Sequence, residues 1–318
     1  MELIISNIAS IFLIVAVGFG ANKAGVLPMT ANKYLSSLLL KVTCPCIVIT
    51  SMASNQLNAD TLNITIQALV GSCLWIYASS LIGIFLSKKI FRIPSEDQGT
   101  YALAFGSANN GFIGFPITIA LFGSGILYIM IIHNIAMQVF FLYSLGGLIL
   151  NMNSEGGSIN VSGLLATIRN PNTIAAVIGF IIMFTGISIP EPLFECFDMI
   201  GSATTPLSML LVGMQLGECE FSSIIKNKNL FIMCALKMVL IPVLTFLAVN
   251  WLPLMPEVKV GLVFAASFPA AVAIVPVISE ENKDPLLAAE IVTLTTILSM
   301  VMIPVAASFL INTYGISA

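Results

Sequence analysis

The chain has 318 residues, of which 58% are hydrophobic and 8% are charged, and its formal net charge is −3. Soluble domains have roughly 25% charged residues, so this chain cannot cover a water-facing surface and most of its exterior must face lipid. The lack of a basic segment argues against nucleic acid as a partner. The six cysteines and the single histidine, His133, show no spacing typical of a metal or redox site. Composition therefore predicts an all-α integral membrane protein without a metal or other cofactor.

Ten apolar runs of about twenty residues follow one another along the chain, each long enough to cross a bilayer as a helix. The first run lacks the basic segment of a signal peptide, so it is interpreted as a membrane span. Short polar connections join the runs. The predicted spans are 3–22, 31–53, 63–87, 99–122, 126–150, 172–189, 196–217, 229–251, 258–279 and 286–311.

The distribution of lysine and arginine predicts the orientation of these spans. Nine of the twelve basic residues fall in connections on one side, and only Lys259 falls on the other, whereas Lys41 and Lys237 lie within spans. Connections rich in lysine and arginine stay in the cytoplasm. We therefore predict a multi-pass protein of the cell inner (cytoplasmic) membrane with both termini outside.

Matching segments occur in the two halves of the chain, about 160 residues apart. With five spans in each half, the second copy must insert upside down, which gives the inverted repeat found in many secondary transporters. Apolar segments also match by chance, but three matches in nearly one register favour a repeat. The matches are Val42–Pro45 with Ala203–Pro206, Leu103–Phe105 with Leu262–Phe264, and Phe115–Ile117 with Val275–Val277. The predicted organisation is a first five-helix repeat at 1–150, a cytoplasmic connection at 151–170 and a second, inverted repeat at 171–318.

The fourth predicted span contains residues that interrupt a helix. Asn109, Asn110 and Gly111 lie near its middle, and Pro116 follows. Two carboxamides in hydrocarbon are costly unless they find partners, and glycine and proline weaken a helix. This pattern predicts a broken membrane helix; a loop between two short buried helices is the alternative interpretation.

The ninth predicted span is interrupted at the corresponding depth by Ser267 and Pro269, with Pro276 further along. Breaks at matching positions of two repeats indicate a substrate site near the middle of the membrane. Backbone N–H groups at the start of a resumed helix favour an anion such as a carboxylate. We therefore predict that Asn109 and Asn110, facing Pro269, bind the anionic group of a substrate. Capping of the resumed helix is an alternative role for Asn110.

Two further prolines, Pro45 in the second span and Pro206 in the seventh, correspond through the repeat. Because proline is common in membrane helices, each could simply bend its span. Thr43 and Thr205 lie beside them and are predicted to present hydroxyl groups to the substrate.

Lys237 lies eight residues into the eighth predicted span. An ionisable side chain at such a depth is a functional candidate, here as a charge partner of an acidic substrate or of a step in the transport cycle. Snorkelling of its long side chain to the cytoplasmic headgroups is the alternative.

Several motifs together resemble the auxin efflux carrier family, in particular its bacterial branch of malate- and malonate-permease-like proteins. The resemblance covers the whole chain, with the motifs in order and at the family's spacing. They are Asn109 followed by Gly114-Phe115-Pro116, Asn170-Pro171, Ile189-Pro190, Thr205-Pro206-Leu207 with Gly213 and Leu216, and Thr295 with Leu298-Ser299 and Pro304. The chain departs from the family at Ala270, Ala271 and Ala273, where family members usually carry polar side chains.

The resemblance implies two inverted five-helix repeats whose broken fourth and ninth spans cross at the substrate. It implies a scaffold of spans one, two, six and seven, and a mobile transport domain of the other spans that moves like an elevator. It also implies an organic anion as substrate and a homodimer formed through the scaffold. The alanines after the ninth-span proline imply that this break contributes mainly backbone and Ser267.

We therefore predict a secondary transporter for a small organic anion, a mono- or dicarboxylate. A ligand-gated channel or a membrane solute sensor is the alternative. An intramembrane protease would need a serine–histidine pair or two aspartates within spans. The chain has one histidine, and Asp198 is the sole aspartate near the core of a span, so an enzyme is not predicted.

Overall fold

The computed structural model describes residues 2–28, 30–55, 58–153, 168–218 and 227–316, and the regular elements in those ranges are helices. Most of the predicted connection at 151–170 lies outside the described residues. The α-helices are α1 (Glu2–Lys23), α2 (Thr30–Leu38), α3 (Cys44–Ala53), α4 (Ala59–Phe85), α5 (Gln98–Phe105), α6 (Phe115–Ile135), α7 (Gly146–Leu150), α9 (Pro171–Thr185), α10 (Glu191–Ser202), α11 (Thr204–Glu218), α13 (Lys228–Trp251), α14 (Pro256–Ala266), α15 (Ile274–Glu280) and α16 (Pro285–Tyr314). The π-helical turns are η1 (Leu39–Thr43), η2 (Leu86–Ile90), η3 (Asn110–Gly114) and η4 (Ala136–Leu142).

Six helical segments in the described ranges are long and apolar enough to cross a membrane. One of them, Gln98–Leu142, covers the fourth predicted span and most of the fifth. Gly123 separates those two spans, because its φ of 75° turns the chain in a way that other residues rarely adopt. The first and sixth predicted spans contain shorter apolar helices, and the ninth is divided between α14 and α15. A helix thus lies at each predicted span, while the number of crossings stays a prediction.

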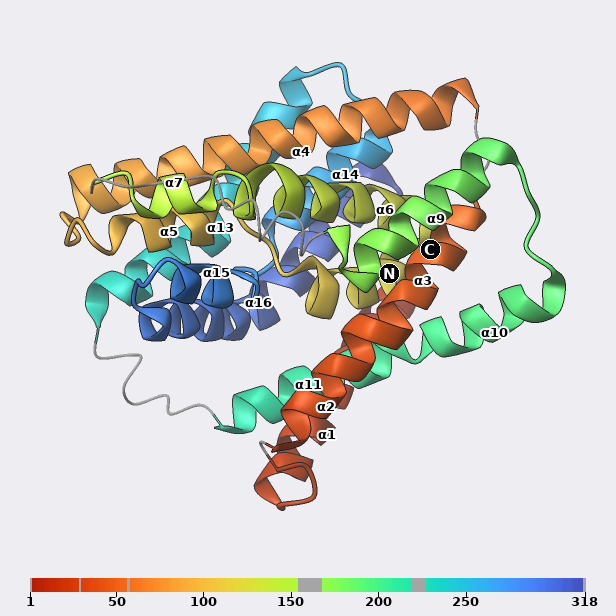
Figure 1. Cartoon of the computed structure of the whole chain (residues 1–318), viewed down its shortest axis with the longest axis horizontal. Coiled ribbons are helices and arrows are strands. Elements are labelled where there is room, and N and C mark those ends of the chain that lie inside the picture. Colours follow the sequence, from red (N-terminus) through yellow and green to blue (C-terminus); the bar gives the residue numbers. More distant parts are fainter. Residues whose placement is uncertain (1, 29, 56–57, 154–167, 219–226, 317–318) are drawn as a thin grey trace.

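The helices form two groups that are interleaved along the sequence. In the first group α1 packs against α11, and α3 packs against α9 and α10. In the second group α4 packs against α5 and α6, and α14 packs against α13, α16 and α6. Figure 1 shows the first group at the lower right and the second at the upper left. The groups correspond to predicted spans one, two, six and seven, and to the remaining spans.

Helices α1 and α11 of the first group touch backbone to backbone. A Cβ atom on Gly213 would overlap the carbonyl oxygen of Val15, and one on Gly18 would overlap that of Leu210. Small residues let membrane helices approach this closely, and the close van der Waals contact holds them together. The pair α1–α11 therefore forms a tightly packed unit.

We expect Gly213→Ala to force α1 and α11 apart and to lower the free energy of unfolding by about 1–3 kcal/mol, the usual effect of overpacking. The measurement is the melting temperature of the purified protein in detergent. Gly20→Ala on α1 is the matched control, because no atom lies within 4 Å of the place its Cβ would take. Equal melting temperatures for the two variants would contradict the close contact.

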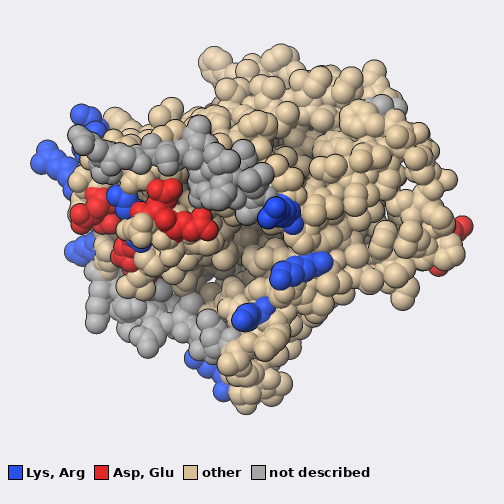
Figure 2. Space-filling view, in the orientation of Figure 1, with Lys and Arg blue, Asp and Glu red and all other residues tan. Residues whose placement is uncertain are grey.

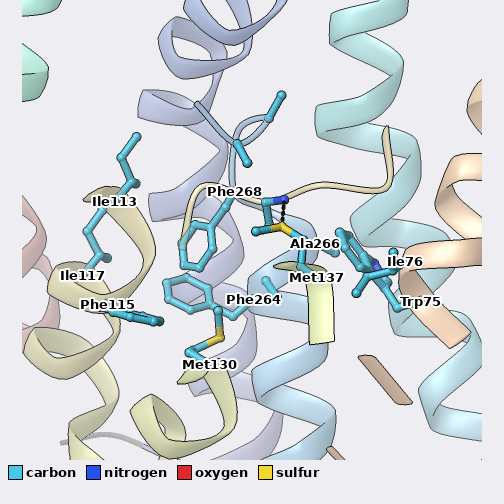
Figure 3. Packing of buried hydrophobic residues seen from close by; sticks show 14 of the residues in the cluster. Trp75, Ile76, Ile113, Phe115, Ile117, Met130, Met137, Phe264, Ala266 and Phe268 are labelled. Atoms are coloured by element: carbon cyan, nitrogen blue, oxygen red, sulfur yellow. Dashed lines mark hydrogen bonds between the residues drawn. The ribbon is translucent and has the colours of Figure 1, made fainter. Parts of the chain in front are cut away.

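Aromatic side chains pack where α14 ends. Phe268 is fully buried and meets Phe264 edge to face, with 4.8 Å between ring centroids. Figure 3 shows these two rings beside Phe115 and Met130 of α6. A Cβ on Gly114 would lie 2.9 Å from Cε2 of Phe268, so glycine at this position lets η3 approach the ring. This packing sets the positions of the two helix breaks relative to each other.

Candidate functional site

The fourth predicted span is broken where the asparagines predicted it. Helix α5 ends at Phe105, the next residues are not helical, and the helix resumes at Asn110 as η3, which continues into α6. Asn109 is the N-cap of the resumed helix, since its side-chain oxygen accepts a hydrogen bond from the backbone N–H of Phe112 at 3.4 Å. The capping role therefore falls to Asn109 and not to Asn110, for which the sequence offers capping as the alternative to binding.

Asn110 has no hydrogen-bond partner for either side-chain amide atom among the described residues, although its exposed fraction is only 1%. Buried polar groups are almost always hydrogen-bonded, so an unpartnered carboxamide is an unusual feature. No hydrogen bond would be lost if its side chain rotated toward a ligand. Asn110 is therefore the stronger candidate of the two asparagines for direct contact with a substrate.

The ninth predicted span is broken between Ala266, the last residue of α14, and Ile274, the first residue of α15. The hydroxyl group of Ser267 donates to the carbonyl of Val263 at 3.0 Å, within its own helix. The N–H of Ala270 donates to the hydroxyl oxygen of Thr295 at 3.1 Å. This break thus contributes mainly backbone, which agrees with the alanines at these positions.

The two breaks meet in the middle of the second group of helices. The backbone N–H of Asn109 donates to the carbonyl of Pro269 at 2.9 Å. The N–H of Ala271 donates to the hydroxyl oxygen of Ser107 at 3.2 Å. These are non-local contacts between segments about 160 residues apart, and they satisfy backbone groups that a continuous helix would have paired internally. The two breaks therefore lie next to each other in the fold.

A cavity of about 610 Å³ borders the meeting point of the breaks and lies between the two groups of helices. Among the described residues its lining is rich in carboxamides and contains no aspartate or glutamate, and Lys33, which is exposed, is the one basic residue. The carboxamides are Asn32, Asn109, Asn110, Asn134, Gln138, Asn170, Asn172 and Gln215. A lining of this kind offers many hydrogen-bond donors and little negative charge.

Four of the predicted site residues line this cavity, namely Asn109, Asn110, Gly111 and Pro276. The other predicted site residues do not line this cavity. Pro269 takes part through its carbonyl, and Thr43 is buried with its hydroxyl unpartnered among the described residues. The other predicted residues, Pro45, Pro116, Thr205, Pro206, Lys237 and Ser267, do not line the cavity.

Sequence reasoning missed the carboxamides that come from other helices. Asn134 and Gln138 lie one turn apart, and the side chain of Gln138 donates to that of Asn134 at 3.3 Å. Asn32 accepts from the side chain of Gln215 at 3.2 Å, which links α2 to α11. Carboxamides four residues apart in an apolar span are a signal that could have identified the first pair.

A second cavity, of about 370 Å³, lies between α3, α10 and α6. Thr50, Ser51 and Thr205 are among the hydroxyl-bearing residues that line it, together with the exposed Asp198. The hydroxyl of Thr205 donates to the carbonyl of Pro116 at 3.3 Å. Thr205 therefore faces the second cavity, and the predicted contact with a substrate at the breaks stays a prediction.

Lys237 is buried on α13, with an exposed fraction of 1%, and its ammonium group donates to the carbonyl of Ser107 at 3.0 Å. Snorkelling to the headgroups is therefore wrong for this side chain. Pro45 lies inside the continuous helical segment Thr30–Ala53, just after the π-helical turn η1, whereas Pro206 lies in the first turn of α11. No group of three or more metal-ligating side chains occurs within the described ranges.

The fold and the cavity define a helical multi-pass membrane protein with a polar cavity beside two broken helices. Residues 3–307 match the family model described as membrane transport protein, and the chain belongs to this family, that of the auxin efflux carriers.

Among its relatives is the uncharacterized transporter YfdV of Escherichia coli, 24% identical over 87% of this chain and 88% of that protein. An uncharacterized transporter of Methanothermobacter thermautotrophicus is 23% identical over 94% of this chain and 95% of that protein. An uncharacterized transporter of Methanocaldococcus jannaschii is 23% identical over 65% of this chain and 67% of that protein. The family and these relatives are transporters by description, not enzymes.

Proposed function

We propose that this protein is a secondary transporter that moves a small organic anion, a mono- or dicarboxylate, across the cytoplasmic membrane by an elevator-like motion. The observation that carries the proposal is the contact between two broken helices beside a polar cavity. In secondary transporters, broken helices at a repeat interface form the substrate site. The α1–α11 and α3–α9 group is then the scaffold, and the group holding both breaks is the moving domain.

The packing of the scaffold group supports the inverted repeat. Gly179 on α9 lies about 160 residues after Gly18 on α1, and each glycine lets its helix approach a partner closely. A Cβ on Gly179 would lie 2.7 Å from Cβ of Met52, and Met52 corresponds to Gly213, which packs against α1. Asn109 and Pro269, which bond to each other, also correspond. Contacts that recur between corresponding residues are expected if two five-span repeats, and thus ten spans, are related by a two-fold axis.

The chemistry of the cavity supports an anionic substrate. Carboxamide N–H groups and the N-terminal end of the η3–α6 helix donate hydrogen bonds and favour negative charge. The ammonium group of Lys33 adds a positive charge at the exposed part of the lining, and the described residues of the lining include no carboxylate that would repel an anion. The resemblance to malate- and malonate-permease-like proteins points to the same class of substrate.

The separation of the two cavities favours a carrier over a channel or a sensor. The 610 Å³ and 370 Å³ cavities share no lining residue, and the contact of Thr205 with Pro116 borders the smaller one. A channel needs a continuous path, whereas alternating access keeps one side closed while the other is open.

The test is uptake by liposomes that contain the purified full chain. Labelled acetate, lactate, malonate, malate and indole-3-acetate are offered with a proton gradient, a sodium gradient or no gradient. We expect saturable uptake of at least one of these anions. Uptake that rises linearly with concentration would indicate a channel, and no uptake of any anion above that of empty liposomes would refute this substrate class.

The orientation is a separate proposal, with both termini outside. On the face drawn in Figure 2, basic side chains lie at the left, near the middle and in the lower part, and none lies at the right edge, toward which α10 extends in Figure 1. We expect a cysteine at Asn58 to react with an impermeant maleimide in intact cells, and one at Ser154, a position outside the described residues, to stay unlabelled. The background lacks the native cysteines. Labelling at 154 alone would reverse the orientation.

A further inference from the structure

The ammonium group of Lys237 lies at the C-terminal end of a broken helix. Helix α5 ends at Phe105, and the carbonyl of Ser107, two residues beyond, accepts the hydrogen bond from Lys237 at 3.0 Å. The last carbonyl groups of a helix carry partial negative charge, so a cation beside them is stabilising. Lys237 reaches this place from α13, a different helix of the same group.

No carboxylate in the described part of the chain forms an ion pair with Lys237. Its ionisable neighbours are Cys234, one turn earlier on α13, and the buried imidazole of His133 on α6. Neither neighbour supplies the full negative charge that a buried ammonium group usually requires. The ammonium is therefore directed at a backbone carbonyl oxygen, as a bound metal cation would be.

Among the described residues, no lysine or arginine side chain is hydrogen-bonded to the corresponding break after α14. The residue that corresponds to Lys237 in the first half is Tyr77, whose hydroxyl donates to the carbonyl of Phe140 at 2.6 Å. At the end of α14 the carbonyl groups of Val263 and Pro269 accept from a serine hydroxyl and a backbone N–H. Within the described part of the chain, the positive charge thus lies at the end of α5 and not at the end of α14.

In transporters with broken helices, unwound carbonyl groups and the C-terminal ends of half-helices coordinate the coupling cation, such as sodium. We propose that the ammonium group of Lys237 takes the place of that dissolved cation at the end of α5, so that the protein transports its anion without sodium. This inference rests on the proposed function, since it concerns how the same site is kept competent for transport.

Lys237 is then a positioning residue, because it acts through Ser107 and does not line the large cavity. The hydroxyl of Ser107 also accepts the N–H of Ala271 in the opposite break. A cation at the carbonyl of Ser107 therefore holds the non-helical segment between α5 and Asn109 in the geometry that lets both breaks meet. Without the cation, we expect this segment to lose its fixed position and the site to lose affinity.

The first experiment replaces the tethered cation by a free one and needs no knowledge of the substrate. Lys237→Ala removes three methylene groups and an ammonium group, which n-propylammonium contains atom for atom. We expect n-propylammonium chloride to raise the melting temperature of the Lys237→Ala protein in detergent, compared with choline chloride at equal ionic strength. Propan-1-ol, which has the same length without the charge, is expected to have no such effect. The parent and a Lys41→Ala control, whose lysine is exposed in the second predicted span, should respond to neither compound.

The second experiment measures liposome uptake of lactate, malonate and malate in sodium and in N-methylglucamine buffers. We expect equal uptake by the parent in both buffers. Uptake by Lys237→Ala should fall by about tenfold to a hundredfold, the range for losing a hydrogen bond to a charged group. It should recover in part with n-propylammonium. A structural role alone would not make the variant depend on an added amine.

Two results would overturn the proposal. One is sodium-dependent uptake by the parent, and the other is normal sodium-free uptake by Lys237→Met, which keeps the volume of the side chain without its charge. If Lys237→Ala fails to fold, the proposal is still tested by uptake of the parent in the two buffers and by sodium-free uptake of Lys237→Met. Failure of the proposed function is distinct from both results, because the parent would then take up none of the anions while the melting experiment still reports on the cation.

Discussion

Replacing Asn110 by alanine is expected to weaken substrate affinity by about ten- to a hundredfold, which corresponds to roughly 1.5–3 kcal/mol for a hydrogen bond to a charged group. The carboxamide of Asn110 is buried and has no partner in the described part of the protein, so a substrate carboxylate can take its N–H donors without competition. The measurement is the concentration dependence of uptake in liposomes for whichever of acetate, lactate, malonate, malate or indole-3-acetate the parent transports.

The stability of the same variant gives an independent test. Because an unpartnered buried carboxamide costs free energy in the folded protein, Asn110→Ala should melt no lower than the parent. Asn109→Ala is the matched control, since it removes the cap that accepts the N–H of Phe112. Loss of a cap typically costs about 1 kcal/mol, so this variant should melt lower. If Asn110→Ala transports like the parent at unchanged affinity, the substrate is bound elsewhere.

The existence and place of both helix breaks could be predicted from the sequence because their causes are local. Asn109, Asn110 and Pro269 are poor residues for the interior of an apolar helix wherever it lies in the fold. Their pairing followed from the repeat, which places them at corresponding depths. The distribution of roles between the two asparagines could not be predicted, because it depends on the backbone angles of the residues at the break. Asn109 has φ −78° and ψ 71°, which places its side chain over the N–H of Phe112.

The direction of the Lys237 side chain could not be predicted either. Helix α13 is apolar on all sides, so its sequence does not distinguish the face that meets lipid from the face that meets α5. The same difficulty applies to the cavity. Its carboxamides come from helices of both groups, and only the packing of those groups brings Asn32 and Gln215 opposite Asn134 and Gln138. Residues that form a site across an interface leave no pattern of spacing in the chain.

The interface between the two groups also provides a direct test of the elevator motion. Ser51 on α3 belongs to the proposed scaffold, and Ser124, just after the turn at Gly123, belongs to the proposed moving domain. The hydroxyl of Ser51 donates to the carbonyl of Ser124 at 3.3 Å, and both residues line the smaller cavity. If one group slides past the other during transport, these two residues must separate in every cycle.

A disulfide bond between cysteines at positions 51 and 124 is therefore expected to reduce liposome uptake to that of protein-free vesicles, because it fixes the two groups in one arrangement. The Ser51→Cys and Ser124→Cys variant is made in a background in which the six native cysteines are replaced by serine, and it is oxidised after reconstitution. Dithiothreitol should restore uptake, which excludes damage by the substitutions. The control pair is Asn151→Cys with Glu281→Cys, since the amide of Asn151 donates to the carboxylate of Glu281 at 2.8 Å within the proposed moving domain. This second disulfide joins parts that move together, so oxidised protein should keep its uptake. Full uptake by the cross-linked 51–124 protein would show that the groups do not slide, and transport would then have to proceed by local opening around Asn110.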